Sequence, residues 1–524
     1  MAIYLNQNGE NFFQYKNARI FVDKSLLIKA TNAVLRSKDA FMCVTRPRRF
    51  GKTLALSMLN AYYSKGCDSR ELFKDLKIAE DPSFESHLNK HNVFLIDMAS
   101  LYTNLIDKGD FVPRLRRNIL ADLEEAYPSI DFSGCLLNEV FAKVKSFSGD
   151  RFIFLIDEWD VIYREEEHNS KLCDEYTEFL RSLFKSSDVS SCIDLVYMTG
   201  ILPIRRYKAQ SALNMFAECN MLCPQSLAPY FGFTEEEVQE LCEKYDADFP
   251  SIKNWYDGYR LGGVEIYNPK SVVEAVLNGE CGDYWVSTSA TEVITSYMNF
   301  DGGSLKVVVA RMLTGENVKL DVTEFGNDLT KVDSPDAALC VLIHLGYLAY
   351  DPETKSCYVP NHEIAVEFKR AIKKLKWKSV FLPMGNSDEL LRLTFEGDAS
   401  FIDKVMDENH EDLASLFNKN KEDVLGIVVY LSYFSAREHY EVRKEEGSAL
   451  GRADLSFYPF EAGYYPFIVE LKIGKKPGEA IAQIKERRYW KAWSRYRGKV
   501  LLVGINYDPK TLKHNSKVEW IDVE

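Results

Sequence analysis

Stretches rich in apolar residues recur through the first 200 positions and end in polar or charged residues. Four have the length of buried strands, at 41–44, 93–98, 152–156 and 193–200. Segments with helical character separate them, at 54–63, 113–127 and 136–146. Strands that are buried on both faces are largely apolar, and helices between them allow parallel pairing. The pattern therefore predicts an α/β fold built on a parallel sheet.

Gly51-Lys52-Thr53 lies between the first of these strands and the helix that follows it. Strand, loop and helix in this order are what a phosphate-binding P-loop requires. Backbone N–H groups at the helix start would hold phosphates, and Lys52 would reach the β- and γ-phosphates. The Thr53 hydroxyl would ligate Mg²⁺. ATP and Mg²⁺ are therefore the predicted cofactors.

The rest of this loop departs from the usual P-loop pattern. Arg46 stands where the first glycine is expected, and Pro47 removes one N–H group. Arg48, Arg49 and Phe50 complete the loop before Gly51. On the motif alone, a basic turn that opens an ordinary helix stays an open alternative.

The strand at 152–156 runs directly into Asp157 and Glu158. The carboxyl ends of strands in an open parallel sheet face the ligand crevice. We therefore expect Asp157 opposite Lys52, holding Mg²⁺, and Glu158 as the general base that polarises the attacking water. A strand that ends near Asp97 lies between the two motifs, as in P-loop ATPases with an extra strand. The alternative is a buried strand that ends in a solvated acidic turn.

The next strand ends at Thr199, which is predicted to act as a polar sensor beside the γ-phosphate. Arg205 and Arg206 follow and are candidates to contact phosphate, in cis or from a neighbouring subunit. A threonine that merely ends a strand and a pair of solvated arginines are the alternatives.

Four segments together resemble the bacterial AAA-ATPase-like family. They are Phe21-Val22-Asp23-Lys24-Ser25, the loop from Arg46 to Thr53, Leu155 to Asp160, and Thr199 to Ile204. The arginine-rich loop without a first glycine is the usual form in that family. The resemblance covers roughly residues 5 to 290, including Trp255 to Tyr259 and Ile266 to Val272. It implies that the whole loop, Arg46 to Thr53, binds the nucleotide.

A second set of candidate residues lies near the C-terminus, around a strand at 467–473. Side chains alternate along a strand, so Glu470 and Lys472 share one face. Asp454 is expected to end an earlier strand beside it. Two carboxylates and a lysine suit metal-assisted phosphodiester hydrolysis, with Asp454 and Glu470 on Mg²⁺ and Lys472 orienting the water. A solvated amphipathic strand is the alternative.

A basic segment follows, with a helix predicted from Glu479 to Tyr496. Ten Lys and Arg against three acids give residues 470–500 a charge of +7, whereas the whole chain carries −13. Basic residues interleaved with Trp and Tyr suit a polynucleotide backbone. A solvated helix face is the other interpretation.

This end of the chain, about residues 400 to 515, resembles the PD-(D/E)xK nuclease superfamily, in the branch often fused to the AAA-ATPase-like family. The resemblance implies metal roles for Asp454 and Glu470, the lysine role for Lys472 and a supporting role for Gln483. Glu446 is a weaker candidate. Ala453-Asp454 replaces Pro-Asp in the first motif, a change that the superfamily tolerates.

Composition and hydropathy limit the predicted class and location of the protein. The longest apolar stretches are too short to span a bilayer, and the N-terminus lacks the features of a secretory signal. The eleven cysteines are scattered and are interpreted as reduced core residues of a cytoplasmic protein.

The predicted fold class is α/β, with three parts. Residues 1–230 form a P-loop NTPase domain of the ASCE type, 231–375 a helical lid and connecting region with a winged helix as one option, and 376–524 a PD-(D/E)xK nuclease-like domain. The predicted function is ATP hydrolysis coupled to a Mg²⁺-dependent nuclease, on DNA in preference to RNA. A nucleotide-switched sensor and an ATP-dependent assembly scaffold are the alternatives. No membrane partner is expected, and a homo-oligomer is left open.

Overall fold

A computed structural model gives the fold. It describes residues 2–166, 168–185, 187–204, 213–285, 288–299, 305–323, 325, 332–414, 421–448, 451–460, 463–493 and 496–523. The chain divides into two compact units. The first comprises Met1–Glu240, Gly258–Val273 and Leu320–Lys355, and the second comprises Leu241–Asp257, Glu274–Lys319 and Ser356–Glu524.

The first unit is built on a five-stranded parallel sheet in the order β2-β3-β4-β1-β5. The strands alternate with helices along the chain, as the apolar runs predicted. The elements are α1 (Glu10–Lys16), α2 (Leu26–Asn32), β1 (Phe41–Thr45), α3 (Lys52–Tyr63), α4 (Arg70–Phe73), α5 (Phe84–His87), β2 (Asn92–Asp97), α6 (Met98–Asn104), α7 (Phe111–Ala126), α8 (Leu137–Ser148), β3 (Phe152–Asp157), α9 (Val161–Glu165), α10 (Ser170–Phe184), α11 (Ser187–Ser190), β4 (Ile193–Gly200) and β5 (Ala217–Cys219).

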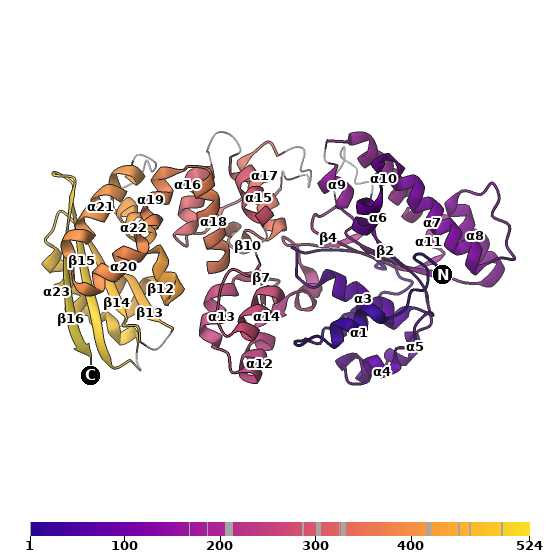
Figure 1. The fold of residues 1–524 in the computed structure, drawn as a ribbon, viewed down its shortest axis with the longest axis horizontal. Helices are drawn as coiled ribbons and strands as arrows, with labels where there is room; N and C mark the ends of the chain where they lie inside the picture. The colour runs from indigo at the N-terminus through magenta and orange to yellow at the C-terminus, as the bar shows by residue number, and fades with distance from the viewer. Residues whose placement is uncertain are drawn as a thin grey trace. The chain divides into compact units, whose positions relative to one another are not determined.

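Helices cover both faces of this sheet (Figure 1). Side chains of β3 point alternately into two hydrophobic cores, one on each face of the sheet. Ile153 and Leu155 pack with residues of α2 and α3. Phe154 and Ile156 pack with residues of α7, α8 and α10. A strand that is buried on both faces must be apolar at every position. This explains the uninterrupted run from Phe152 to Ile156.

Shorter elements follow the parallel sheet. The helix that begins at Glu235 has a reciprocal cap, because the Thr234 N–H donates to Glu237 Oε2 over 2.8 Å and the Glu237 N–H donates to Thr234 Oγ1 over 3.4 Å. The elements are β6 (Phe233–Thr234), α12 (Glu235–Tyr245), α13 (Phe249–Tyr256), β7 (Tyr259–Leu261), β8 (Val264–Tyr267), α14 (Pro269–Asn278), α15 (Thr288–Met298), α16 (Leu305–Leu313), β9 (Val318–Lys319), α17 (Pro335–Leu345), β10 (Ala349–Asp351), β11 (Ser356–Tyr358), α18 (His362–Lys374) and α19 (Lys378–Gly385).

The C-terminal part of the second unit holds a mixed five-stranded sheet in the order β12-β13-β14-β15-β16. The β14–β15 pair is parallel, and the other pairs are antiparallel. The elements are α20 (Ser387–Glu396), α21 (Ala399–Ala414), α22 (Lys421–Ser432), β12 (Tyr440–Ser448), β13 (Gly451–Pro459), β14 (Phe467–Ile473), α23 (Pro477–Arg487), β15 (Gly498–Asp508) and β16 (Lys513–Val523). The predicted fold class, a parallel P-loop-type sheet followed by a C-terminal α/β sheet, is confirmed.

Two predictions about the C-terminal elements were wrong. The helix that begins at Pro477 ends at Arg487 instead of reaching Tyr496, because Arg488 adopts a left-handed conformation with φ of 51°. This turn carries Tyr489 and Trp493 into the core beneath the helix. Asp454 does not end its strand, since β13 extends from Gly451 to Pro459. It immediately precedes Leu455, the first residue of β13 that pairs with β14, opposite Val469.

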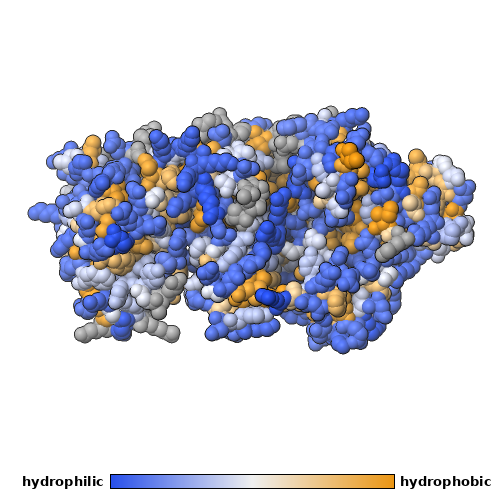
Figure 2. Space-filling model, in the orientation of Figure 1, coloured by the Kyte–Doolittle hydropathy of each residue, from blue (hydrophilic) through white to orange (hydrophobic). Residues whose placement is uncertain are grey.

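Hydrophilic residues dominate the face that Figure 2 shows, with apolar patches between them. Within the described ranges, no helix combines the length and the apolar character that crossing a bilayer requires.

Candidate functional site

The loop between β1 and α3 carries the first group of predicted residues. Gly51 precedes α3 with a φ of 86°, and a Cβ at this position would meet no atom within 4 Å. The glycine is therefore needed for its left-handed backbone and not for space. No side chain caps the start of α3. The first N–H groups of the helix thus keep the arrangement that suits an anion.

Lys52 is buried and its ammonium points back into the loop. It donates to the carbonyl oxygens of Arg46 and Pro47 over 2.9 and 2.8 Å. Burial lowers the pKa of Lys52, and the nearby charge of Glu158 opposes this shift. A bound phosphate would compete with the two carbonyls for the same ammonium.

Asp157 joins residues from three segments. It ends β3, and its Oδ2 accepts a hydrogen bond from the Thr53 hydroxyl over 2.7 Å. Its Oδ1 accepts one from the Thr199 hydroxyl over 2.5 Å. The strand order makes this possible, because β4 lies between β1 and β3. Lys52, Thr53, Asp157 and Thr199 thus gather at one edge of the sheet, as parallel strands allow.

Close packing behind Thr199 requires a glycine. A Cβ on Gly200 would lie 2.6 Å from the Trp159 ring and 2.7 Å from Asp160 Oδ1. Asp160 Oδ2 accepts from the backbone N–H groups of Ile201 and Leu202 over 3.0 and 2.8 Å. The turn after β3 is therefore fastened directly to the end of β4.

Glu158 is held by an arginine that the sequence analysis did not single out. Its carboxylate pairs with the guanidinium of Arg164, which also reaches Asp160 Oδ2 over 3.2 Å. Burial raises the pKa of Glu158, and the charge of Arg164 opposes the shift. Asp160 immediately precedes α9, and Arg164 follows Asp160 by four positions, a spacing that brings side chains together on a helix. This four-residue spacing is the feature of the sequence that could have identified Arg164 as a partner of the acidic turn.

The remaining loop residues fall into two groups. Arg46 is fully buried, and its guanidinium donates to the carbonyl oxygens of Thr45 and Cys219 over 2.8 and 3.0 Å, which ties the loop to β5. The Phe50 ring is also buried and packs edge-on against Tyr259, with 5.4 Å between the ring centroids. Pro47 is buried, whereas Arg48 and Arg49 are exposed. The predicted phosphate contacts from Arg205 and Arg206 lie outside the described residues.

A cavity of about 620 Å³ opens beside the start of α3. Its walls come from the N-terminal segment, the loop and the turns near β6 and α14; they include Tyr15, Phe21, Lys24, Arg49, Gly51, Leu54, Tyr230 and Lys270. Its volume lies in the range of small-molecule sites. Lys24 is fixed there, since its ammonium donates to Pro229 O over 2.7 Å and pairs with Glu237 Oε2 over 2.5 Å.

The second group of predicted residues gathers on β13, β14 and α23. Glu470 is 1% exposed, and its Oε1 accepts from Lys472 over 2.8 Å and from Gln483. Asp454 Oδ2 accepts from the Leu471 N–H over 2.7 Å. Burial and then the charge of Asp454 raise the pKa of Glu470 to about 7. Glu470 Oε2 is buried and has no hydrogen-bond partner among the described residues.

Tyr489 completes this group and was not assigned a role from the sequence. Its hydroxyl accepts a hydrogen bond from Gln483 Nε2 over 2.9 Å, so it orients the amide that faces Glu470. The left-handed residue Arg488 turns Tyr489 inward. Glu446, the weaker candidate, lies on β12 opposite Ala453, and its side chain is not among those described.

The donor set fits Mg²⁺. In the part of the chain that the structure describes, no group of three or more His, Cys, Asp or Glu residues is arranged to hold a metal ion. Mg²⁺ characteristically takes one or two protein carboxylates and completes its shell with water and substrate phosphate. The unsatisfied Oε2 of Glu470 beside Asp454 offers such a pair. Thr53 and Asp157 offer a hydroxyl and a carboxylate in contact with each other.

Comparisons with known proteins agree with these two groups. Residues 10–208 match the family described as Predicted AAA-ATPase, and residues 420–517 match the PD-(D/E)XK nuclease superfamily. An uncharacterized protein in the vnfD 5' region of Azotobacter chroococcum mcd 1 is 20% identical over 476 residues, which cover 88% of this chain and 89% of that protein.

Two solved structures are similar over part of the chain. The ORC2 protein of Aeropyrum pernix is 11% identical, with a TM-score of 0.25, and the match covers 67% of this chain and 94% of that one. Cdc6p from Pyrobaculum aerophilum is 10% identical, with a TM-score of 0.23 and coverages of 67% and 93%. Similarities this low add nothing to what the strand order already establishes.

Proposed function

Because residues 10–208 form a predicted AAA-ATPase domain and residues 420–517 a PD-(D/E)XK nuclease superfamily domain, we propose that this chain couples ATP hydrolysis to metal-dependent cleavage of nucleic acid. DNA is the proposed substrate. The buried, unsatisfied Glu470 oxygen beside Asp454 and Lys472 is the observation that carries the proposal. Leaving such an oxygen unpaired costs about 1–3 kcal/mol, which a bound cation would offset.

The nucleotide half of the proposal follows from the loop and the cavity. The phosphates of ATP would lie at the start of α3, where Lys52 exchanges its two carbonyl partners for phosphate oxygens. Thr53 and Asp157 would hold Mg²⁺, and the base and ribose would occupy the cavity beside Leu54. Glu158 would leave Arg164 to orient the attacking water.

In the nuclease half, Asp454 and Glu470 would hold Mg²⁺, which supplies charge stabilisation and an activated water when bound. Lys472 would orient that water and offset charge on the scissile phosphate. Gln483, oriented by Tyr489, would keep Glu470 in place. Exposed basic residues after β14 would bind the substrate backbone, namely Lys475, Lys476, Lys485, Arg487, Arg488 and Lys491.

The test is cleavage of a supercoiled plasmid with Mg²⁺ or Mn²⁺, with and without ATP. We expect metal-dependent nicking by the wild type and at least about a 100-fold loss in Lys472→Ala, because this lysine acts at the reacting phosphate. Lys491→Ala is the matched control, since it removes an exposed basic residue from the same segment. It should weaken DNA binding and leave the cleavage rate at saturating DNA unchanged.

Equal nicking by the wild type and Lys472→Ala would contradict a nuclease site at Glu470. DNA binding without cleavage in Mn²⁺ would instead favour a nucleotide-switched sensor. Size-exclusion chromatography with and without ATP tests the other alternative, an ATP-dependent assembly scaffold: an ATP-dependent size shift without affinity for nucleic acid would favour it.

A further inference from the structure

A second cavity lies in the C-terminal part of the second unit, on the face of the sheet away from Glu470. Its volume is about 490 Å³, within the range of small-molecule sites. Phe467 marks this face, because its ring packs against Phe395 of α20 with 5.5 Å between the centroids. Glu470 follows Phe467 by three positions on β14 and so points to the opposite face. The cavity is therefore distinct from the candidate nuclease residues.

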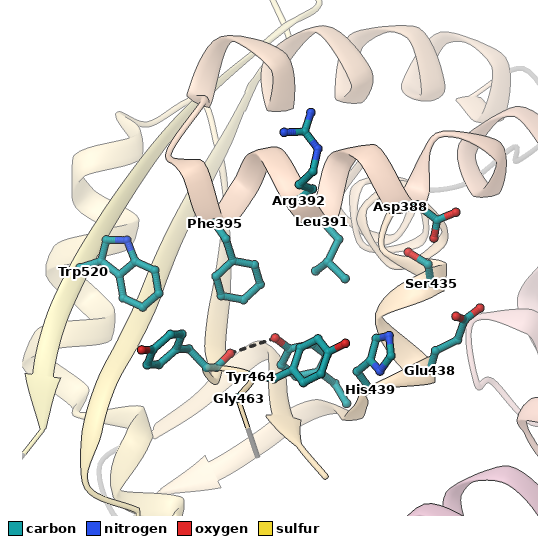
Figure 3. A pocket seen from close by; sticks show the side chains of 12 residues that line it. Asp388, Leu391, Arg392, Phe395, Ser435, Glu438, His439, Gly463, Tyr464 and Trp520 are labelled. Carbon is teal, nitrogen blue, oxygen red and sulfur yellow. Dashed lines mark hydrogen bonds between the residues drawn. The ribbon is translucent and has the colours of Figure 1, made fainter. Parts of the chain in front are cut away.

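Aromatic rings form one end of this cavity (Figure 3). Trp520 of β16 lies 6.0 Å from Phe395 and 5.4 Å from Tyr465, measured between ring centroids. Tyr464 stacks on His439 at 4.4 Å. The Tyr440 hydroxyl donates to Tyr465 O over 3.1 Å, which fixes the loop that carries these rings. The walls are thus held in place by their own contacts, although Trp520 and Tyr464 are still 39% and 38% exposed.

Two carboxylates stand at the other end (Figure 3). Asp388 lies in the first turn of α20, and Glu438 ends the short helix before β12. Both residues are exposed to solvent, and neither side chain makes a hydrogen bond or an ion pair within the described residues. Burial and then the charge of Asp388 raise the pKa of Glu438, while His439 and Lys369 act in the opposite sense. Both acids line this end of the cavity, so both charges would act on a ligand bound there.

The cation that lines the same cavity does not neutralise these acids. Arg392 pairs with Glu396 one turn further along α20, with 2.5 Å between Nη1 and Oε1. The Ser435 hydroxyl accepts from Ser387 over 2.7 Å and is engaged within the wall. Within the described residues, the two acids therefore form no salt bridge with the cavity lining.

We infer that this cavity binds a small organic cation, with its charged head between Asp388 and Glu438 and its apolar body against Phe395, Tyr464 and Trp520. Aromatic faces attract cations through the ring quadrupole. A phosphate would be repelled by the two acids, and a neutral apolar ligand would strip water from them without compensation. A guanidinium or an alkylammonium on a short carbon chain meets both requirements. This inference stands independently of the proposed nuclease.

Isothermal titration of the full-length protein with agmatine tests it. We expect saturable binding to the wild type and no binding of butylurea, the uncharged analogue. Asp388→Asn and Glu438→Gln should each weaken agmatine binding at least about tenfold, because each removes a charged partner of the head group. Trp520→Leu should weaken it about threefold to tenfold through loss of the ring face.

Two control variants make the result specific to this cavity. Glu389→Gln removes an exposed acid next to Asp388 on α20 that does not line the cavity. Asp454→Asn removes an acid from the other face of the sheet. Both should bind agmatine as the wild type does. An arginine-containing peptide that competes with agmatine would show that the cavity accepts a guanidinium on a polypeptide, and a peptide that does not compete would restrict the cavity to small cations.

Absence of saturable agmatine binding to the wild type would overturn the inference. Unchanged affinity in the double variant Asp388→Asn, Glu438→Gln would overturn it as well.

Discussion

At the scale of single residues, the two glutamates proposed to act in chemistry have opposite surroundings. Glu158 is bound by Arg164, so its charge is already compensated. Glu470 keeps one buried oxygen without a partner among the described residues. The first arrangement holds a general base away from its water until the ion pair opens. The second favours entry of a cation, since a cation would stabilise the ionised carboxylate.

Glu158→Gln separates ATP binding from ATP hydrolysis. The amide is isosteric with the carboxylate but cannot accept a proton from water. We expect ATP turnover to fall at least about 100-fold, whereas the affinity for ATP should change by less than about threefold. Phosphate release and equilibrium ATP binding measure the two effects. Glu165→Gln, on an exposed acid of α9, is the control and should hydrolyse ATP normally. Full turnover by Glu158→Gln would remove Glu158 from the mechanism.

At the scale of elements, the position of α23 depends on a glycine in the sheet beneath it. A Cβ on Gly504 of β15 would lie 2.6 Å from Pro477 O and 2.9 Å from Ala480 Cβ. Because residue 504 is a glycine, α23 packs on β15 more closely than any side chain at this position would allow. Because Gln483 and the turn to Tyr489 follow on the same helix, this contact also determines where the amide meets Glu470.

Gly504→Ala tests the contact. The added methyl group must displace the first turn of α23, so we expect a loss of about 1–3 kcal/mol in the free energy of unfolding. Gly426→Ala in α22 is the matched control, because a Cβ there meets no atom within 4 Å. Alanine within a helix should stabilise that variant by about 0.5–1 kcal/mol. Urea unfolding of both variants gives the comparison, and equal stabilities would show that α23 does not need the close approach.

The sequence predicted elements well where a single pattern decided them. The continuous apolar run of β3 was identified as a buried strand. The end of α23 was missed, because the sequence around Arg488 carries no glycine or proline to announce a left-handed turn. The edge strand β16, Lys513–Val523, was not predicted. Its many charged residues, which are typical of an edge strand, obscure the alternation of apolar and polar residues that would predict a strand.

At the scale of the whole molecule, the candidate sites were predictable as sets of residues but not as networks. Spacing alone pointed to Thr53, Asp157 and Thr199, which the strand order then brings into contact. The contacts that hold other members in place could not be foreseen. Arg46 turns into the core to bind β5, and Arg164 binds Glu158, because burial of a guanidinium depends on which carbonyls and carboxylates surround it.

Buried histidines make both units sensitive to acid. Burial lowers the pKa of His344 and of His362 to about 3, and that of His410 to about 4. His344 belongs to the first unit, and the other two belong to the second. The folded state therefore disfavours the protonated rings. The stability that the three neutral histidines contribute is fully present above the pKa of an unfolded histidine, about 6.5. It is lost as the pH falls toward the lower pKa values of the folded state.

When the pH falls from 7.5 to 5.0, we expect each of these histidines to lower the free energy of unfolding by about 2 kcal/mol. This follows because pH 5.0 lies about 1.5 units below the pKa of an unfolded histidine, and each unit corresponds to about 1.4 kcal/mol. His362→Phe should make this loss of stability about 2 kcal/mol smaller, because phenylalanine does not titrate. The substitution suits the site, since the ring of His362 contacts Trp255 and Phe434 and its nitrogens have no hydrogen-bond partner in the described residues. Urea unfolding followed by circular dichroism at the two pH values measures the difference. If His362→Phe lost as much stability as the wild type, protonation of His362 would not contribute to acid unfolding, and the loss would have to come from the other two rings.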